Sequence, residues 1–147
     1  MANTAANLAA ERWVVDHGLP GVIIGHRFAP RKMPLTWGGQ FAFDAVSDDG
    51  SIVAVISTSS AKTATGKNAT AKFQKLKTDA LYLLHLAAPA RMLMVFTEVD
   101  MRDYFDKATR TGRFPPSIER LFLALPPDLQ AGVLATRAIA SRETSPR

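Results

Sequence analysis

Apolar residues recur at the spacing of one helix face near the start of the chain. Residues 5–17 follow this spacing and predict an amphipathic helix. Asn3 or Thr4 can cap its first turn, because their side chains accept hydrogen bonds from free backbone N–H groups. Gly18 followed by Pro20 predicts the end of this helix.

A second helix is predicted from about residue 68 to the residues before Pro89. Its apolar stripe consists of Phe73, Leu76, Ala80, Leu83, Leu84 and Ala87. Lys72, Lys75 and Asp79 lie on a different face, which we expect to be exposed to solvent.

Between these helices lie two β-rich runs, Phe41 to Val46 and Ile52 to Ser59. Residues 47–51 separate them and supply turn-forming side chains, with a glycine where a positive φ is needed. The pattern predicts a β-hairpin. Residues 22–24 are predicted to be extended, and residues 26–39, interrupted by prolines, predict a loop or a strand edge.

The last third of the chain predicts four further elements and a frayed tail. They are a buried strand at 91–97, a short helix at 101–108 capped by Asp100, a strand at 119–125, a helix from 126 to about 141, and a tail at 140–147. Helices and strands therefore alternate. This order predicts an α/β fold in which helices flank both faces of a central mixed sheet, formed by residues 1–147 as one domain.

The composition limits the class of protein. The 147 residues are 47% hydrophobic and 21% charged, which is typical of a globular domain. No apolar run approaches the ~18 residues of a membrane span, and residues 1–20 lack the features of a secretory signal. There is no cysteine. We therefore expect a cytoplasmic protein without membrane partners and without thiol or Cys-ligated zinc chemistry.

Positive charge is concentrated in one segment. The formal net charge is +5, and between residues 61 and 77 there is no acidic residue. The basic residues there are Lys62, Lys67, Lys72, Lys75 and Lys77, and a second group consists of Arg27, Arg31 and Lys32. They predict either an ordinary solvated surface or a strip that follows nucleic-acid phosphates. A stacking platform for single strands is disfavoured, because Phe73 is the only aromatic residue in the lysine segment.

The chain lacks the common catalytic motifs, namely a phosphate-binding loop, GxGxxG, GxSxG and HExxH. Its three histidines are scattered, without metal-ligand spacing. Glu98 and Asp100 follow the strand at 91–97, where α/β sheets often place ligand-binding groups. We interpret Asp100 instead as a helix cap.

The pattern from Asn3 to Thr97 resembles the core of the PD-(D/E)XK nucleases, the restriction-endonuclease-like superfamily. The resemblance implies the order helix, three strands, helix, strand, and a divalent metal held by carboxylates. Glu11 resembles the carboxylate of the family's first helix. Asp44, in FAFDAV, resembles its metal-binding aspartate.

The sequence departs from the family where the Glu-x-Lys motif is expected, since Ser57-Thr58-Ser59 occupies that place. Such a site loses most of the charge that holds a hard cation. Two rescues are possible: Lys75 and Asp79 can substitute from the following helix, or Lys62 can reach back from the loop. A structural alternative is that Asp44 accepts hydrogen bonds from nearby loop amides and that Lys75 and Asp79 form an ordinary surface pair.

Three hypotheses follow. The leading one is a degenerate nuclease-like domain without a competent metal site or cofactor, acting as a nucleic-acid-binding or assembly module through the basic residues. The second is a divergent Mg²⁺- or Mn²⁺-dependent nuclease using Glu11, Asp44, Lys75 and Asp79. The third is a protein-interaction domain, such as a homodimer.

Overall fold

The computed structural model describes residues 5–63 and 65–144, with side chains placed up to residue 138. Its strands are β1 (Phe28–Pro34), β2 (Gln40–Ser47), β3 (Ile52–Ser57), β4 (Arg91–Phe96) and β5 (Ile118–Phe122). Its helices are α1 (Ala5–Trp13), α2 (Leu19–Val22), α3 (Thr70–Leu84), α4 (Val99–Arg110) and α5 (Pro127–Thr144). A π-helical segment, Val14–Gly18, joins α1 to α2.

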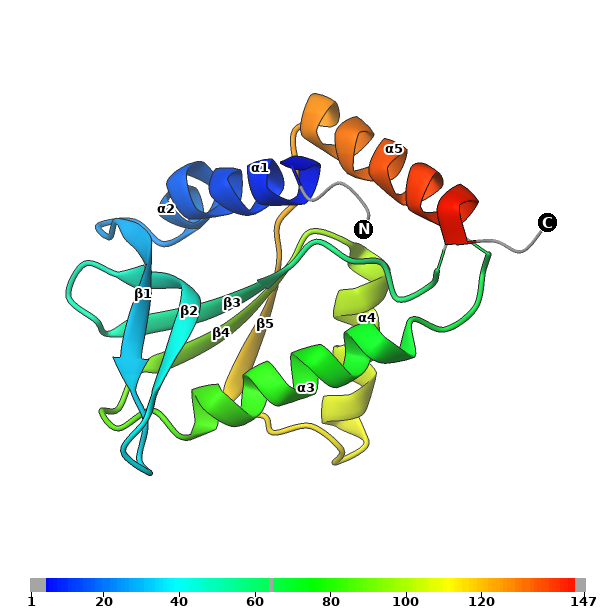
Figure 1. Ribbon diagram of the computed structural model, residues 1–147. Helices are drawn as coiled ribbons and strands as arrows, with labels where there is room; N and C mark the ends of the chain where they lie inside the picture. Colours follow the sequence, from blue (N-terminus) through cyan, green and yellow to red (C-terminus); the bar gives the residue numbers. More distant parts are fainter. Residues whose placement is uncertain (1–4, 64, 145–147) are drawn as a thin grey trace.

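The strands form one sheet in the order β1-β2-β3-β4-β5. β1, β2 and β3 pair antiparallel, whereas β3, β4 and β5 pair parallel through crossovers that contain α3 and α4. α1, α2 and α5 cover one face of the sheet, and α3 and α4 cover the other (Figure 1). The predicted α/β fold with a central mixed sheet between helices is confirmed.

The first helix extends further than the sequence predicts. Gly18 and Pro20 do not end it, because the π-helical segment shifts the hydrogen bonds: Leu19 N–H donates to the carbonyl of Val14. Pro20, which has no N–H, then lies in the first turn of α2, where proline is tolerated. The helix runs on to Val22, so the extended segment predicted at residues 22–24 is wrong. The caps predicted at Asn3 or Thr4 lie outside the described residues.

Gly18 has a packing role instead. A Cβ atom there would lie 3.0 Å from the ring of Trp13 and 3.1 Å from Leu123 Cδ1. The glycine therefore leaves room for the Trp13 ring and for Leu123, which follows β5, and helix-end signals do not reveal this reason for glycine.

β1 settles the alternatives for residues 26–39, because residues 28–34 form an edge strand. Its register against β2 shifts between Ala29 and Arg31, at Pro30. Proline donates no hydrogen bond, so a bulge in an edge strand is where a sheet tolerates it. The predicted hairpin is confirmed as β2 and β3.

The remaining elements differ from the prediction at their ends. α3 ends at Leu84, before Pro89, and α4 begins at Val99 with Glu98 rather than Asp100 at the N-cap position. β5 begins at Ile118 and ends at Phe122. α5 continues to Thr144, so the tail predicted to fray from residue 140 is partly helical. Within residues 5–63 and 65–144, no helix combines the length and apolarity that spanning a membrane requires.

Candidate functional site

Asp44 lies where β2 and β3 stop pairing. The residue pairs between these strands are Ala45 with Ala54 and Val46 with Val53. Beyond them, Asp44 Oδ2 accepts a hydrogen bond of 2.7 Å from Ile56 N–H. The carboxyl group thus takes the place of a strand partner. The donor is an amide of β3 and not one of the loop amides that the structural alternative predicts.

Burial raises the pKa of Asp44, and the charge of Asp79 raises it further, whereas the Ile56 hydrogen bond and Lys75 oppose the increase. The hydrogen bond therefore does not fully compensate for the loss of solvent around the carboxylate. Additional positive charge near the Asp44 carboxyl group would stabilise its ionised form.

Glu11 brings a second carboxyl group to this place from α1. It is half-buried. Burial raises its pKa from an ordinary 4.5 to about 7, the charge of Asp44 adds to the increase, and Lys75 acts against it. The two carboxyl groups named by the resemblance are therefore close enough for their charges to interact.

Lys75 and Asp79 reach the same place from α3. Lys75 Nζ donates to Asp79 Oδ2 over 2.9 Å. The Lys75 side chain is 67% exposed, but that of Asp79 is only 9% exposed. The expectation that both belong to an exposed face is therefore wrong for Asp79. The reason is that residue 79 lies at the margin of the apolar stripe, beside the buried Leu76, Ala80 and Leu83 of the same helix.

Glu11, Asp44, Lys75 and Asp79, called the carboxylate cluster below, therefore come together from α1, β2 and α3. Three carboxyl groups face one ammonium group, so negative charge is in excess when all are ionised. This excess and the burial together favour binding of a cation.

The carboxylate cluster does not have the geometry of a closed metal site. Among the residues that the structure describes, the one group of three metal-binding side chains with ligand atoms within 4.8 Å of one another is His26, Asp48 and Asp49. In the carboxylate cluster, at least one pair of carboxyl groups is therefore further apart than that. Mg²⁺ commonly keeps several waters and binds one or two carboxylates, so a wider arrangement is compatible with it.

The His26, Asp48 and Asp49 group has a structural explanation. Asp49 Oδ1 already accepts hydrogen bonds from Ser47 Oγ, Ser51 N–H and Ser51 Oγ, all within the hairpin turn. These bonds lower the pKa of Asp49. His26 approaches the exposed side of this turn, with Nδ1 3.3 Å from Asp48 Oδ1.

Ser57 and Ser59 provide no replacement charge. Ser57 is 6% exposed, and its Oγ accepts a hydrogen bond of 3.3 Å from Ser59 N–H. Val53 and Val55 pack in the apolar layer under α3, so strand alternation places Ser57 on that side as well. The face that would carry the Glu-x-Lys motif therefore points toward the helix that carries Lys75 and Asp79.

The basic residues named from the sequence are all exposed. Arg31 and Lys32 pair with Phe43 and Ala42 of β2, so they flank the strand that carries Asp44. Arg27 precedes β1. Lys62 donates to Asn68 across a short bridge, and Lys67 lies within that loop. Lys72 lies one helical turn before Lys75.

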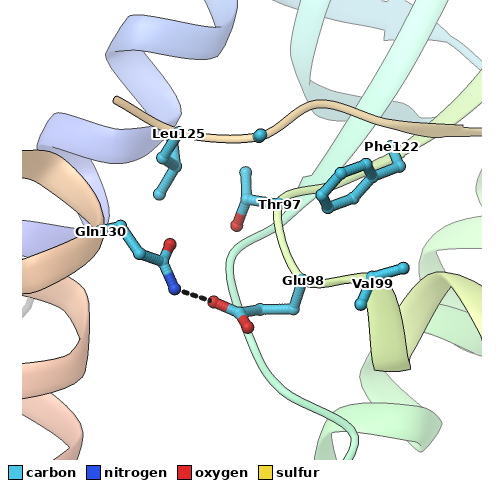
Figure 2. Close-up of a pocket in the computed structure, with 7 residues that line it drawn as sticks. Thr97, Glu98, Val99, Phe122, Leu125 and Gln130 are labelled. Carbon is cyan, nitrogen blue, oxygen red and sulfur yellow. Dashed lines mark hydrogen bonds between the residues drawn. The ribbon is translucent and has the colours of Figure 1, made fainter. Parts of the chain in front are cut away.

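A cavity of about 210 Å³ lies beside the carboxyl ends of β4 and β5. It is lined by Thr97, Glu98, Val99, Phe122, Ala124, Leu125 and Gln130. Figure 2 shows Gln130 donating to Glu98 from across this cavity, over 2.9 Å. Arg137 donates both to Glu98 and to the carbonyl of Thr58. Gln130 and Arg137 belong to α5, and no sequence signal pointed to them.

Asp100 corrects an expectation. It is not the N-cap of α4; its Oδ2 accepts hydrogen bonds from Ser60 Oγ and Ala61 N–H. The carboxyl group therefore holds the segment after β3 against the start of α4. The sequence could not reveal this, because the partners lie about 40 residues away.

No family model, no curated protein and no solved structure matches this chain. The function of the chain is therefore inferred from the arrangement of its own residues.

Proposed function

We propose that this chain is a divergent PD-(D/E)XK nuclease that hydrolyses phosphodiesters with Mg²⁺ or Mn²⁺. The observation that carries the proposal is the carboxylate cluster, in which Lys75 and Asp79 of α3 meet Glu11 and Asp44. The order of elements from α1 to β4 agrees with the helix, three strands, helix and strand that the resemblance implies. In this proposal, α3 supplies the acid and the lysine that β3 lacks.

The donor set fits a hard cation. Asp44 and Asp79 each use Oδ2 for a hydrogen bond, and within the described part of the chain their Oδ1 atoms make none. The Oδ1 atoms of Asp44 and Asp79 are the proposed ligands of the cation, and the carboxyl group of Glu11 is a third. When bound, the cation supplies a water of lowered pKa and positive charge beside the phosphate.

Lys75 has the properties of a phosphate-binding group. Burial lowers the pKa of Lys75, but the hydrogen bond to Asp79 and the nearby carboxylates raise it more, so the pKa is above its ordinary value. The amine therefore stays protonated at neutral pH. It can donate to a phosphate oxygen and stabilise negative charge in the transition state, but it cannot serve as a base.

Glu11 has the properties of a proton acceptor. A pKa of about 7 leaves a large fraction of the carboxyl groups ionised at neutral pH while keeping them basic enough to accept a proton from water. Glu11 can therefore assist the attack of water if it does not bind the cation itself.

The proposal is tested by incubating plasmid, single-stranded DNA and RNA with the protein in Mn²⁺, with a chelator as the blank. We expect cleavage by the wild type, and a loss of about 100-fold or more in Asp44→Asn and Lys75→Ala. Asp48→Asn, an exposed acid on the same hairpin, is the matched control and should cleave normally. Equal behaviour of the wild type and Asp44→Asn would refute the nuclease.

A second candidate function is nucleic-acid binding without cleavage. It is favoured by the uncharged Ser57 and Ser59 and by the ion pair in which Asp79 already holds Lys75. This function predicts that Asp44→Asn binds as well as the wild type or better, because it removes a negative charge. It also predicts a fall in affinity with rising salt. Binding that is indifferent to salt would contradict it.

A further inference from the structure

Trp37 lies at the tip of the β1–β2 hairpin and is 54% exposed. Gly38, which follows it, has a φ of +97°, a conformation that glycine adopts without strain. Trp37 is thus one of the large apolar side chains that the fold leaves open to solvent, and neither the nuclease proposal nor the core uses it.

The tip is held firmly to the C-terminal end of α3, which lies beside it in Figure 1. Thr36 N–H donates to the carbonyl of His85 over 2.8 Å, and Ala87 N–H donates to Pro34 over 3.0 Å. Thr36 Oγ1 also lies 3.2 Å from His85 Nδ1. Trp37 is therefore presented from a fixed position, which reduces the entropy lost when a ligand packs on it.

Trp37 belongs to a group of aromatic rings. Its ring centroid lies 4.8 Å from that of His85 and 6.0 Å from that of Tyr82. Tyr82 in turn stacks on Phe41 of β2, with a centroid distance of 4.2 Å and an interplanar angle of 10°. The folded chain thus provides the aromatic surface that is missing from the lysine segment in the sequence.

This aromatic group and the carboxylate cluster lie along the same side of α3. Lys75, Asp79 and Tyr82 are spaced at i, i+4 and i+7, so they share one helix face, and Lys75 and Tyr82 are about 10 Å apart along the axis. On β2, Asp44 and Phe41 are also about 10 Å apart. Two elements therefore give the same separation between the cluster and the aromatic group.

The surroundings favour an anionic partner. Arg31 and Lys32 are exposed on β1 and lie between the level of Asp44 and the hairpin tip. Successive strand residues point to opposite faces of a sheet, and Arg31 shares its face with Met33, which packs with Phe41 in the layer under α3. Arg31 is therefore the cation on the side of the aromatic group. Leu81 and Leu84 are exposed as well, but helix spacing places them beyond His85, away from the face of Tyr82.

We propose that Trp37 is a stacking platform for an unpaired nucleobase of the strand whose phosphate lies at the carboxylate cluster. The inference rests on the proposed function and narrows its substrate class to nucleic acid that is single-stranded or carries an unpaired segment. A base inside an intact duplex stacks on its neighbours and cannot offer its face to Trp37. Aromatic platforms accept any base, because every base has a π face.

The experiment uses the tryptophan itself as the reporter. The chain has two tryptophans, so Trp13→Phe leaves Trp37 as the only one. This variant is titrated in chelator, at low salt, with oligothymidylate and with a blunt duplex of equal length. We expect saturable quenching by the single strand and little by the duplex. Absence of quenching by the single strand, or equal quenching by both, would overturn the inference.

Affinity provides the second measurement. In the chain that retains Trp13, Trp37→Ala should weaken single-strand binding about 5- to 150-fold and leave duplex binding unchanged, while Trp37→Phe should retain most of the affinity. Equal binding by all three proteins would overturn the platform. Self-association that Trp37→Ala abolishes, without quenching by oligothymidylate, would assign the surface to a protein partner instead.

The two proposals fail in different ways. Quenching and binding are measured without a metal, so they do not depend on cleavage. If the protein binds single strands through Trp37 but never cleaves them, the stacking platform is supported and the nuclease is refuted. If the wild type and Trp37→Ala cleave single strands at the same rate, the nuclease is supported and the stacking platform is refuted.

Discussion

Glu11→Gln is expected to make the protein more stable at neutral and higher pH. Glutamine has nearly the same shape as glutamate but carries no charge, so it removes the repulsion by Asp44 and the penalty for burying a carboxylate. At a pH below the ordinary pKa of glutamate, Glu11 is protonated in both folded and unfolded chains. The variant and the wild type should then be equally stable.

The magnitude follows from the shifted pKa. Because the folded chain binds the proton of Glu11 more tightly than the unfolded chain does, stability is lost as the pH rises from 4.5 through about 7. Each pKa unit corresponds to about 1.4 kcal/mol. The whole rise of the Glu11 pKa, from 4.5 to about 7, therefore corresponds to about 3 kcal/mol of folding free energy. Glu11 is only half-buried, and solvent screening reduces the expected gain to about 1–2 kcal/mol.

Chemical denaturation is carried out from about pH 4 to about pH 9. The free energy of unfolding of Glu11→Gln should exceed that of the wild type by an amount that increases with pH. Glu119→Gln is the matched control. The hydrogen bond from Arg91 lowers the pKa of Glu119, so Glu119 favours folding above its unfolded pKa and its replacement brings no gain at neutral pH. Stability curves for Glu11→Gln and the wild type that stay parallel over the whole range would refute the electrostatic account.

Three further predictions concern stability and binding. Gly18→Ala should destabilise the fold by about 1–3 kcal/mol, because its Cβ would meet Trp13 and Leu123, whereas Gly21→Ala, which meets nothing within 4 Å, should be neutral or stabilising. Thermal melts of both variants compare them directly, and equal shifts would contradict the packing role. Asp100→Ala should lose about 1–3 kcal/mol in a urea titration, against less than about 1 kcal/mol for the exposed Asp103→Ala. Binding of oligothymidylate should weaken with salt, and Lys72→Ala should reduce the slope of log affinity against log salt by about one.

Local patterns predicted much of the fold. The hairpin, the buried β4 and the amphipathic α3 each follow from a short repeat of apolar residues, and together they predict the sheet with helices on both faces. The end of the first helix was missed because Gly18 and Pro20 are ordinary stop signals. The π-helical segment that accommodates them has no sequence signature that we recognised.

The candidate site was predicted only in part. Asp44 and Glu11 were found through the resemblance, and Lys75 and Asp79 through their spacing, but burial of Asp79 depends on how α3 lies on the sheet. Contacts between distant segments were not accessible in the same way. Trp37 meets His85 from 48 residues away, so no local window contains both. Asp100 follows α3 in the chain but binds Ser60 and Ala61, which precede it.

The hydrogen bond from Ile56 to Asp44 makes one backbone amide a reporter of the site. Its proton faces a carboxyl oxygen rather than a peptide carbonyl, so its NMR chemical shift should follow the ionisation of that one side chain as the pH changes. Occupation of Asp44 by a cation should move the same resonance. A single peak in a spectrum of the labelled protein can thus record both protonation and metal binding at the residue on which the proposed chemistry depends.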